Sequence, residues 1–139
     1  AKSRKDRPDI KKNGIIFFGS LNQKDVVFAI NAADVAVIPS PKNEFTKYCF
    51  PYKCVEYMAC NTPIVATSLS DVSIMLKEHS GSLCAPDNED ELYIKIKAQL
   101  DKGKINYRKK LKNFTWDSMA LKLDKIIKNK NKKSSSLKR

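Results

Sequence analysis

Residues 51–67 read Pro-Tyr-Lys-Cys-Val-Glu-Tyr-Met-Ala-Cys-Asn-Thr-Pro-Ile-Val-Ala-Thr. The first part has apolar residues at helical spacing, and its inward face comprises Cys54, Val55, Met58 and Ala59. The last five residues form a mostly apolar run with several β-branched side chains, which is typical of a strand buried in a parallel sheet. The stretch therefore predicts a helix, a short turn with Asn61 as a left-handed C-cap, and a buried strand.

The same alternation extends in both directions. Short apolar runs bounded by Gly, Pro or Ser predict four strands, at Gly14–Phe18, Val35–Ile38, Pro63–Thr67 and Gly81–Cys84. Apolar stripes behind capping residues predict further helices at 22–33, at 70–79, from Asp87 or Asn88 to Leu100, and from Thr115 to Ile127. A basic helical piece is expected at 106–112, Trp116 is expected to anchor the last helix, and 42–50 is expected to be a loop. Repeated strand–helix alternation predicts an α/β fold, a Rossmann-like parallel sheet with helices on both faces.

The basic residues gather at the two ends of the chain. The net charge is +12, yet residues 1–12 and 128–139 carry 12 of the 27 Lys and Arg residues and 2 of the 15 acids, so 27 − 12 = 15 bases face 15 − 2 = 13 acids between them. We therefore expect residues 1–13 to be a basic linker or frayed end, 14–127 an incomplete Rossmann-like domain, and 128–139 a basic disordered tail. Solvated arms are the simplest interpretation of the ends, and contact with an anionic membrane surface or with nucleic acid is the alternative.

Several classes of site are disfavoured by the residues present. Cys49, Cys54, Cys60 and Cys84 form no Cys-x-x-Cys pair, and His79 is the single histidine, so we expect reduced, mostly buried thiols and no metal site. The chain has no Gly-x-Gly-x-x-Gly or Walker-type loop and no credible catalytic triad. No apolar run approaches the roughly 18 residues of a membrane span, and no leader opens the chain, so we expect a cytoplasmic protein.

The predicted fold locates a candidate site. Ligands of open parallel sheets bind beyond the carboxyl ends of the strands, here the loops at 19–22, 39–50, 67–71 and 85–88. The helix that starts at Pro51 offers free N–H groups to an anion, and Lys53 adds a positive charge there. Glu56 follows one turn later and accepts hydrogen bonds, so the two side chains suit a sugar nucleotide. The alternative is a Lys53–Glu56 surface pair, and Gly19-Ser20 is either a close approach to a ligand or a simple turn.

A family resemblance rests on these same residues. The chain reads Phe17-Phe-Gly19, Ala33-Asp34, Pro39-Ser40, the segment 51–67, Gly81-Ser-Leu-Cys-Ala-Pro86-Asp87 and Phe114-Thr-Trp116. In this order they resemble the C-terminal, donor-binding part of GT-B glycosyltransferases of the group 1 (GT4-like) type. The resemblance runs from about Gly14 to Ile127, and its central segment is fairly specific.

The resemblance implies a retaining transferase that uses a UDP- or GDP-sugar as substrate, with no cofactor, and moves a hexose to a glycan or lipid-linked acceptor, as in polysaccharide biosynthesis. It implies that Glu56 holds the donor ribose, that Lys53 and the backbone from Phe50 to Tyr52 lie near the diphosphate, and that Gly19, Ser20 and Leu21 lie near the base. Where the family often has a glutamate eight residues before Glu56, this chain has Tyr48, and Glu44 is the candidate substitute.

The first half of the donor domain and the acceptor domain of the family have no counterpart in this sequence. We therefore expect a fragment, a truncated frame or a subunit completed by a partner chain, inactive as a transferase by itself. Two alternatives stay open, a non-catalytic Rossmann-like module that binds a nucleotide or a partner, and a basic-armed protein that binds nucleic acid. The near-neutral middle of the chain disfavours nucleic acid, while basic ends next to a lipid-linked acceptor suit peripheral membrane contact.

Overall fold

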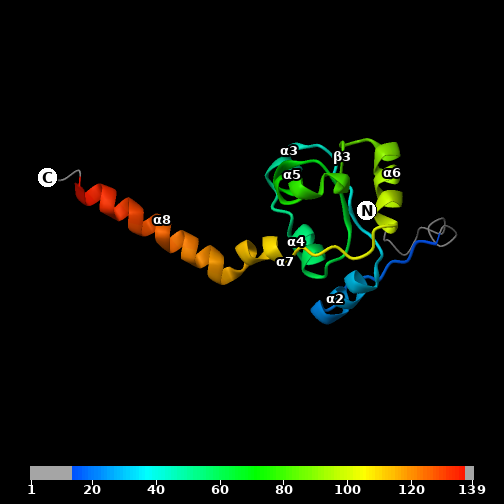
Figure 1. Ribbon diagram of the computed structural model, residues 1–139, viewed down its shortest axis with the longest axis horizontal. Coiled ribbons are helices and arrows are strands. Elements are labelled where there is room, and N and C mark those ends of the chain that lie inside the picture. Colours follow the sequence, from blue (N-terminus) through cyan, green and yellow to red (C-terminus); the bar gives the residue numbers. More distant parts are fainter. Residues whose placement is uncertain (1–13, 137–139) are drawn as a thin grey trace.

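The computed structural model describes residues 14–136, so the expected basic segment 1–13 lies outside the described residues (Figure 1). Its sheet has three parallel strands in the order β1-β2-β3. Ala36 of β1 pairs with Ile64 of β2, and Ala66 of β2 pairs with Leu83 of β3. The strands are β1 (Ala36–Ile38), β2 (Ile64–Thr67) and β3 (Leu83–Cys84). The predicted α/β class with a parallel sheet is confirmed.

Helices account for most of the remaining described chain. They are α2 (Gln23–Ala32), α3 (Glu44–Tyr48), α4 (Tyr52–Ala59), α5 (Ser70–Met75), α6 (Glu89–Leu100), α7 (Arg108–Leu111) and α8 (Trp116–Ser136), with the 3₁₀ segments η2 (Lys77–Ser82) and η3 (Lys112–Phe114). The predicted caps are present, since the Asn22 side chain accepts from Asp25 N–H and the Asn88 side chain accepts from Glu91 N–H.

The central strand β2 organises the core, and every residue in it is buried. On one face, Ile64 and Ala66 belong to a cluster with side chains of α4 and α5 and with Tyr107, and α6 packs on β2 from the other side (Figure 1). Helices on both faces leave no water-exposed side, which is why 63–66 is continuously apolar rather than alternating.

The turn between α4 and β2 depends on Asn61. Its φ is 56°, the left-handed conformation that the sequence predicts for this C-cap. The Asn61 side-chain oxygen accepts from Tyr107 N–H at 3.2 Å, and its main-chain oxygen accepts from Ile105 N–H at 3.1 Å. The next residue, buried Thr62, donates its hydroxyl to Ile30 O of α2 at 2.9 Å. One turn thus links α4 and β2 to two sequence-distant segments.

The prediction of a buried strand at 14–18 is wrong. This segment joins neither edge of the described sheet, and β1 pairs with β2 alone. A strand is stable in a sheet only when a neighbour takes up its ladder hydrogen bonds, and apolar composition does not supply that neighbour. The apolar side chains of the segment are consequently exposed, Phe18 to 66%.

Three other expectations are corrected. The expected loop at 42–50 contains α3, because the Asn43 side chain accepts from Thr46 N–H and the Thr46 hydroxyl accepts from Asn43 N–H, a capping box that starts a helix. The expected disordered tail from residue 128 is helical to Ser136, since Lys is a good helix former and no Gly or Pro interrupts the run. Trp116 is 82% exposed and does not anchor α8 to the core.

The Asn61 turn yields a stability prediction. We expect Asn61→Ala to lower the free energy of unfolding by about 2 kcal/mol, because alanine is strained at positive φ and loses the bond to Tyr107 N–H. Asn61→Gly accepts the backbone conformation and loses only the hydrogen bond, so it should cost about 1 kcal/mol less than alanine. Urea unfolding followed by circular dichroism compares the two variants, and equal stabilities would contradict the role of the left-handed turn.

The single histidine yields a pH prediction. Burial, and then the positive charges of Lys110 and Lys102, lower the pKa of His79 despite an opposing effect of Glu78, and its ring packs edge-on against Tyr107 with centroids 4.9 Å apart. Because the unfolded chain then takes up the proton more readily, protonation of His79 destabilises the fold as pH falls below the ordinary pKa of 6.5.

A proton NMR titration of the His79 ring should give a pKa below 6.5 in the folded chain. The same titration in concentrated urea is the control and should return the ordinary value. A folded-state pKa at or above the ordinary value would contradict the packing of His79.

Candidate functional site

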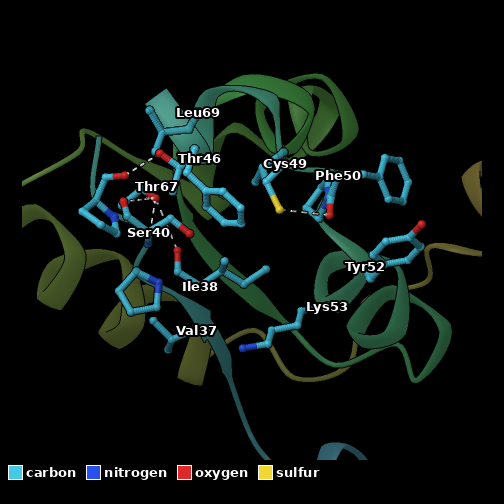
Figure 2. Close-up of a pocket in the computed structure, with 15 residues that line it drawn as sticks. Val37, Ile38, Ser40, Thr46, Cys49, Phe50, Tyr52, Lys53, Thr67 and Leu69 are labelled. Carbon is cyan, nitrogen blue, oxygen red and sulfur yellow. Dashed lines mark hydrogen bonds between the residues drawn. The ribbon is translucent and has the colours of Figure 1, made fainter. Parts of the chain in front are cut away.

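A cavity of about 480 Å³ lies beyond the carboxyl ends of β1 and β2 (Figure 2). Its lining comes from the end of β1, the loop with α3, the start of α4 and the segment after β2, which brings together 37–41, 45–46, 49–53, Thr67, Leu69 and Val72. A smaller hollow of about 220 Å³ adjoins it, shares Ser40 and Thr67, and reaches 85–89. Three of the four predicted loops therefore meet at one place, and the loop 19–22 does not line either hollow.

Thr67 holds the loop after β1 in position. This buried hydroxyl donates to Ser40 O at 2.9 Å and accepts from Ser40 N–H at 3.1 Å (Figure 2). Thr46 continues the bracing, since its hydroxyl donates to Pro41 O at 2.7 Å. The sequence predicts Thr67 as part of the strand but does not predict this bracing role. A signal was present, because a hydroxyl at the carboxyl end of a parallel strand lies beside the end of the neighbouring strand β1 and can bond to its backbone.

Lys53 supplies the charge at this cavity. It lies in the first turn of α4 and lines the cavity, and in Figure 2 its side chain extends from α4 toward Val37 and Ile38 of β1. The ion pairs found within residues 14–136 do not include Lys53, so the alternative of a Lys53–Glu56 surface pair is not what the structure has. An exposed ammonium beside a mostly apolar cavity suits an anionic ligand.

The N-terminus of α4 offers fewer donors than the sequence predicts. Tyr52 N–H donates to Phe50 O at 3.0 Å, and Cys54 N–H donates to Pro51 O at 2.9 Å, so both groups are used internally. The Lys53 N–H has no such bond among the contacts of the described residues. The anion-binding capacity of this end therefore depends on Lys53, through its N–H and its ammonium group.

Aromatic rings form one rim of the cavity. Phe50 and Tyr52 meet edge-on with centroids 4.9 Å apart, and Phe50 lies 6.3 Å from the ring of Phe114, which precedes α8. The predicted residues Phe50, Tyr52 and Lys53 are thus brought together at the cavity. Flat aromatic surface next to a cation suits a ligand that has an apolar or planar part and an anionic part.

The other predicted residues lie elsewhere. Glu56 is exposed on α4 and does not line the cavity. Glu44 is exposed on α3 and forms an ion pair with Lys47 at 3.8 Å. Neither Glu44 nor Tyr48 lines the cavity, whose wall at this point consists of Phe45, Thr46 and Cys49. Gly19, Ser20 and Leu21 are exposed before α2.

The four cysteines differ in how exposed their thiols are. All four are free thiols, and no group of three or more metal-ligating side chains occurs within the described residues. Burial raises the pKa of Cys54 to about 11 and also raises that of Cys84, so both stay protonated at neutral pH. The prediction of mostly buried thiols is only half right, because Cys49 is exposed at the cavity and Cys60 is half-buried.

Comparison with known families decides the classification. Residues 2–102 match the family model of the glycosyl transferases group 1, which is most of the chain and includes all three strands and the residues around both hollows. The chain belongs to the group 1 glycosyltransferases. This membership confirms the resemblance and indicates glycosyl transfer, with a nucleotide-sugar donor and an acceptor in general. Neither a curated protein nor a solved structure matches the chain significantly.

The C-terminal segment of this glycosyltransferase chain lies outside the family match. The match ends at residue 102, so α7 and α8 are not covered by it. Across residues 14–136, no helix has the length and apolar character needed to cross a membrane.

The thiols allow a chemical test of the cavity geometry. In the native state, iodoacetamide should modify Cys49 first, Cys60 more slowly, and Cys54 and Cys84 only after unfolding, because access and the raised pKa values protect the last two. Peptide mass spectrometry after timed labelling assigns the order. Early modification of Cys54 would contradict the packing of α4 on β2, and labelling in urea, where all four should react, is the control.

Proposed function

We propose that the cavity beyond β1 and β2 binds the nucleoside diphosphate part of a UDP- or GDP-sugar, as one wall of the donor site of a retaining GT-B (GT4-type) transferase. The transferred group is a hexose, and the acceptor is a glycan or a lipid-linked sugar of cytoplasmic polysaccharide biosynthesis. The observation that carries the proposal is the Lys53 ammonium group, which has no ion pair among the described residues and lies at the edge of an apolar, aromatic cavity.

The size and chemistry of the cavity support this ligand. Its volume of about 480 Å³ falls within the roughly 300–1,000 Å³ of small-molecule sites. Phe50 and Tyr52 offer ring surface and Lys53 offers a cation within a few residues, which suits a ligand with a planar part and an anionic part. The Lys53 ammonium group and a backbone N–H are able to stabilise the negative charge of a diphosphate.

Lys53 has a defined part in the proposed reaction. As the bond between the anomeric carbon and the diphosphate oxygen breaks, that oxygen keeps the electron pair and gains negative charge. A cation already held at that point stabilises the leaving diphosphate more than it stabilises the intact donor, and this difference lowers the barrier. The cavity wall formed by the loop after β1 is held in place by the hydrogen bond from Thr67 to Ser40 and by the capping box of α3.

Glu56 has a proposed part as the ribose contact. It follows Lys53 by three residues, so both project from one side of α4. A ribose next to the diphosphate would therefore extend from the cavity across the outer surface of α4. By family resemblance, Gly19, Ser20 and Leu21 would lie near the base, and Glu44 would substitute for the glutamate that the family often has eight residues before Glu56, where this chain has Tyr48.

Calorimetric titration with UDP and GDP tests the proposal. We expect binding of at least one diphosphate to exceed binding of the matching nucleoside, and Lys53→Gln to weaken it about tenfold, which corresponds to about 1.4 kcal/mol. Lys77→Gln is the matched control, because Lys77 is an exposed lysine that does not line the cavity. Glu56→Gln should weaken diphosphate and nucleoside binding equally, since ribose is common to both.

Equal affinity for nucleoside and diphosphate would contradict the role of Lys53, and no binding at millimolar concentrations would contradict the site. A last outcome separates the transferase from the non-catalytic module. If the chain, together with any segment or partner that completes it, binds a UDP- or GDP-hexose but does not release the sugar, the non-catalytic module is favoured.

A further inference from the structure

A further hollow, which we call the His79 hollow, lies at the amino-terminal edge of the sheet. Its volume is about 360 Å³, and its lining comes from η2, the end of α6 and the segment that follows: Glu78, His79, Gly81, Ser82, Gln99, Lys102 and Ile105. Ser82 directly precedes β3, whereas the candidate donor cavity lies where β1 and β2 end. The His79 hollow is therefore a separate site, and it shares no lining residue with that cavity.

The floor of the His79 hollow contains polar side chains whose hydrogen bonds are not made. Ser82 and Gln99 are each 1% exposed, and within the described residues the Ser82 hydroxyl and the Gln99 Oε1 atom have no hydrogen-bond partner. The buried Tyr107 hydroxyl also lacks a bond of normal geometry. Burial raises the pKa of Tyr107, and the Ile64 backbone and the nearby Ser82 hydroxyl oppose the rise.

Such a concentration of unused polar atoms has a physical cost. Buried polar groups in folded proteins are nearly always hydrogen-bonded, and each one left without a partner destabilises the fold. Ser82 and Gln99 both line the His79 hollow, and Tyr107 lies beside Ser82. Their position indicates that the hollow is built to hold a polar ligand.

The rim of the His79 hollow is positively charged. Lys102 is exposed and belongs to no ion pair in the part of the chain that the structure describes, whereas Glu78 is paired with Lys110 at 3.3 Å. Burial, and then the charges of Lys110 and Lys102, lower the pKa of His79, and Glu78 opposes this only in part. The end of α6 adds a partial negative charge, which Lys102 offsets at that same helix end. The rim therefore favours an anion over a cation.

Gly81 leaves room for a ligand between these groups. A Cβ atom at this position would lie 3.1 Å from Lys102 Nζ and 3.6 Å from Gln99 Nε2, so two nitrogen donors border the space next to the glycine. Gly81 is not among the glycines with positive φ, so its backbone conformation does not require glycine. The space that a side chain would fill is instead available to an oxygen atom held by an ammonium group and an amide.

The donors and acceptors of the hollow distinguish among ligands. Lys102 Nζ and the Ser82 hydroxyl donate to anionic oxygen, whereas Gln99 Oε1 only accepts and needs a ligand that carries a proton. Water would satisfy the floor but leave the charge of Lys102 unused. Sulfate and carboxylates are fully ionised at neutral pH and offer no proton to Gln99 Oε1. Inorganic phosphate keeps a P–OH group at neutral pH, and a sugar phosphate carries hydroxyl groups, so both supply a donor together with anionic oxygen.

We propose that the His79 hollow binds a phosphate group, held by Lys102 and Gln99 next to Gly81 with the Ser82 hydroxyl on the floor. The group belongs either to free phosphate or to a small hydroxylated phosphate monoester. The exposed Lys102 side chain has a flexible stem, so its ammonium group can move outward and admit the ligand to the floor. The proposal does not rest on the nucleotide site, because the two hollows have no residue in common.

His79 provides the measurement, because it is the single histidine of the chain and lines the hollow. In phosphate-free buffer at neutral pH, added potassium phosphate should shift the ring resonances of His79 in the proton NMR spectrum of the full chain until the site is saturated. The bound anion should also raise the pKa of His79. Sodium sulfate at equal ionic strength should bind more weakly, since it has no proton for Gln99 Oε1.

Two further titrations identify the source of the phosphate group. Glucose 6-phosphate should bind more tightly than inorganic phosphate if the ligand is a monoester, and more weakly if the ligand is free phosphate. Glucose, which lacks the anionic group, should not shift the His79 resonances.

Two lysines of the same region provide a matched pair of variants. Lys102→Gln should weaken phosphate binding about tenfold, because it removes a charge-assisted hydrogen bond. Lys97→Gln should leave binding nearly unchanged, since Lys97 is an exposed lysine of α6 that does not line the hollow. Gly81→Ala should also weaken binding, because its Cβ occupies the space next to Lys102 Nζ.

Gln99→Leu separates a ligand contact from a structural role. Because Gln99 Oε1 has no partner within the described residues, a buried leucine should keep or raise the urea midpoint of unfolding while phosphate binding is lost. Circular dichroism in urea gives the midpoint, and the His79 resonances give the binding.

The proposal would be overturned by the absence of a saturable His79 shift with phosphate and glucose 6-phosphate. An equal response to phosphate and sulfate would also overturn it, because screening of charge would then explain the shift. Unchanged phosphate binding in Lys102→Gln or in Gln99→Leu would leave ordered water as the occupant of the floor. Titration of UDP and GDP against Lys53→Gln is a separate measurement, so this site and the nucleotide site can fail independently.

Discussion

The left-handed turn at Asn61 is the constraint on which the rest of the structure depends. It reverses the chain from α4 into β2 within a few residues, so the helix packs at once on the strand that follows it. Its side-chain oxygen also accepts a hydrogen bond from Tyr107 N–H, and its main-chain oxygen accepts one from Ile105 N–H. These two bonds hold the segment after α6 against the core. Few side chains tolerate this conformation and also accept a hydrogen bond, and asparagine does both.

The position of the candidate site is a consequence of that packing. Because α4 is held against β2, its first turn lies beside the end of β1, and Lys53 comes to the edge of the cavity. The opposite wall is held by a single buried hydroxyl, that of Thr67, on both polar atoms of the Ser40 backbone. The braced wall and the lysine therefore lie on different sides of the same cavity.

Helix α8 lies on a part of the chain that the core barely constrains. The ring of Phe114 packs at the aromatic rim, and after Thr115 the chain continues as one helix that carries its apolar residues in solvent. The described core does not hold this helix in place, because none of its exposed apolar side chains belongs to the core cluster. The site and the helix are therefore connected by a few aromatic residues and differ in what stabilises them.

Sequence by itself determined the elements whose signals are local. Caps at Asn22 and Asn88, the left-handed Asn61 and the apolar run of β2 all depend on neighbouring residues, and the structure has each of them. The family also followed from sequence, because its motif at 51–67 is contiguous. Tertiary structure alone decided whether the apolar run 14–18 has a strand to pair with, that Gln99 rather than Leu100 is buried on α6, and that Thr67 braces the cavity. Each of these depends on which distant groups come within hydrogen-bonding or van der Waals distance, and the spacing of residues along the chain does not contain that information.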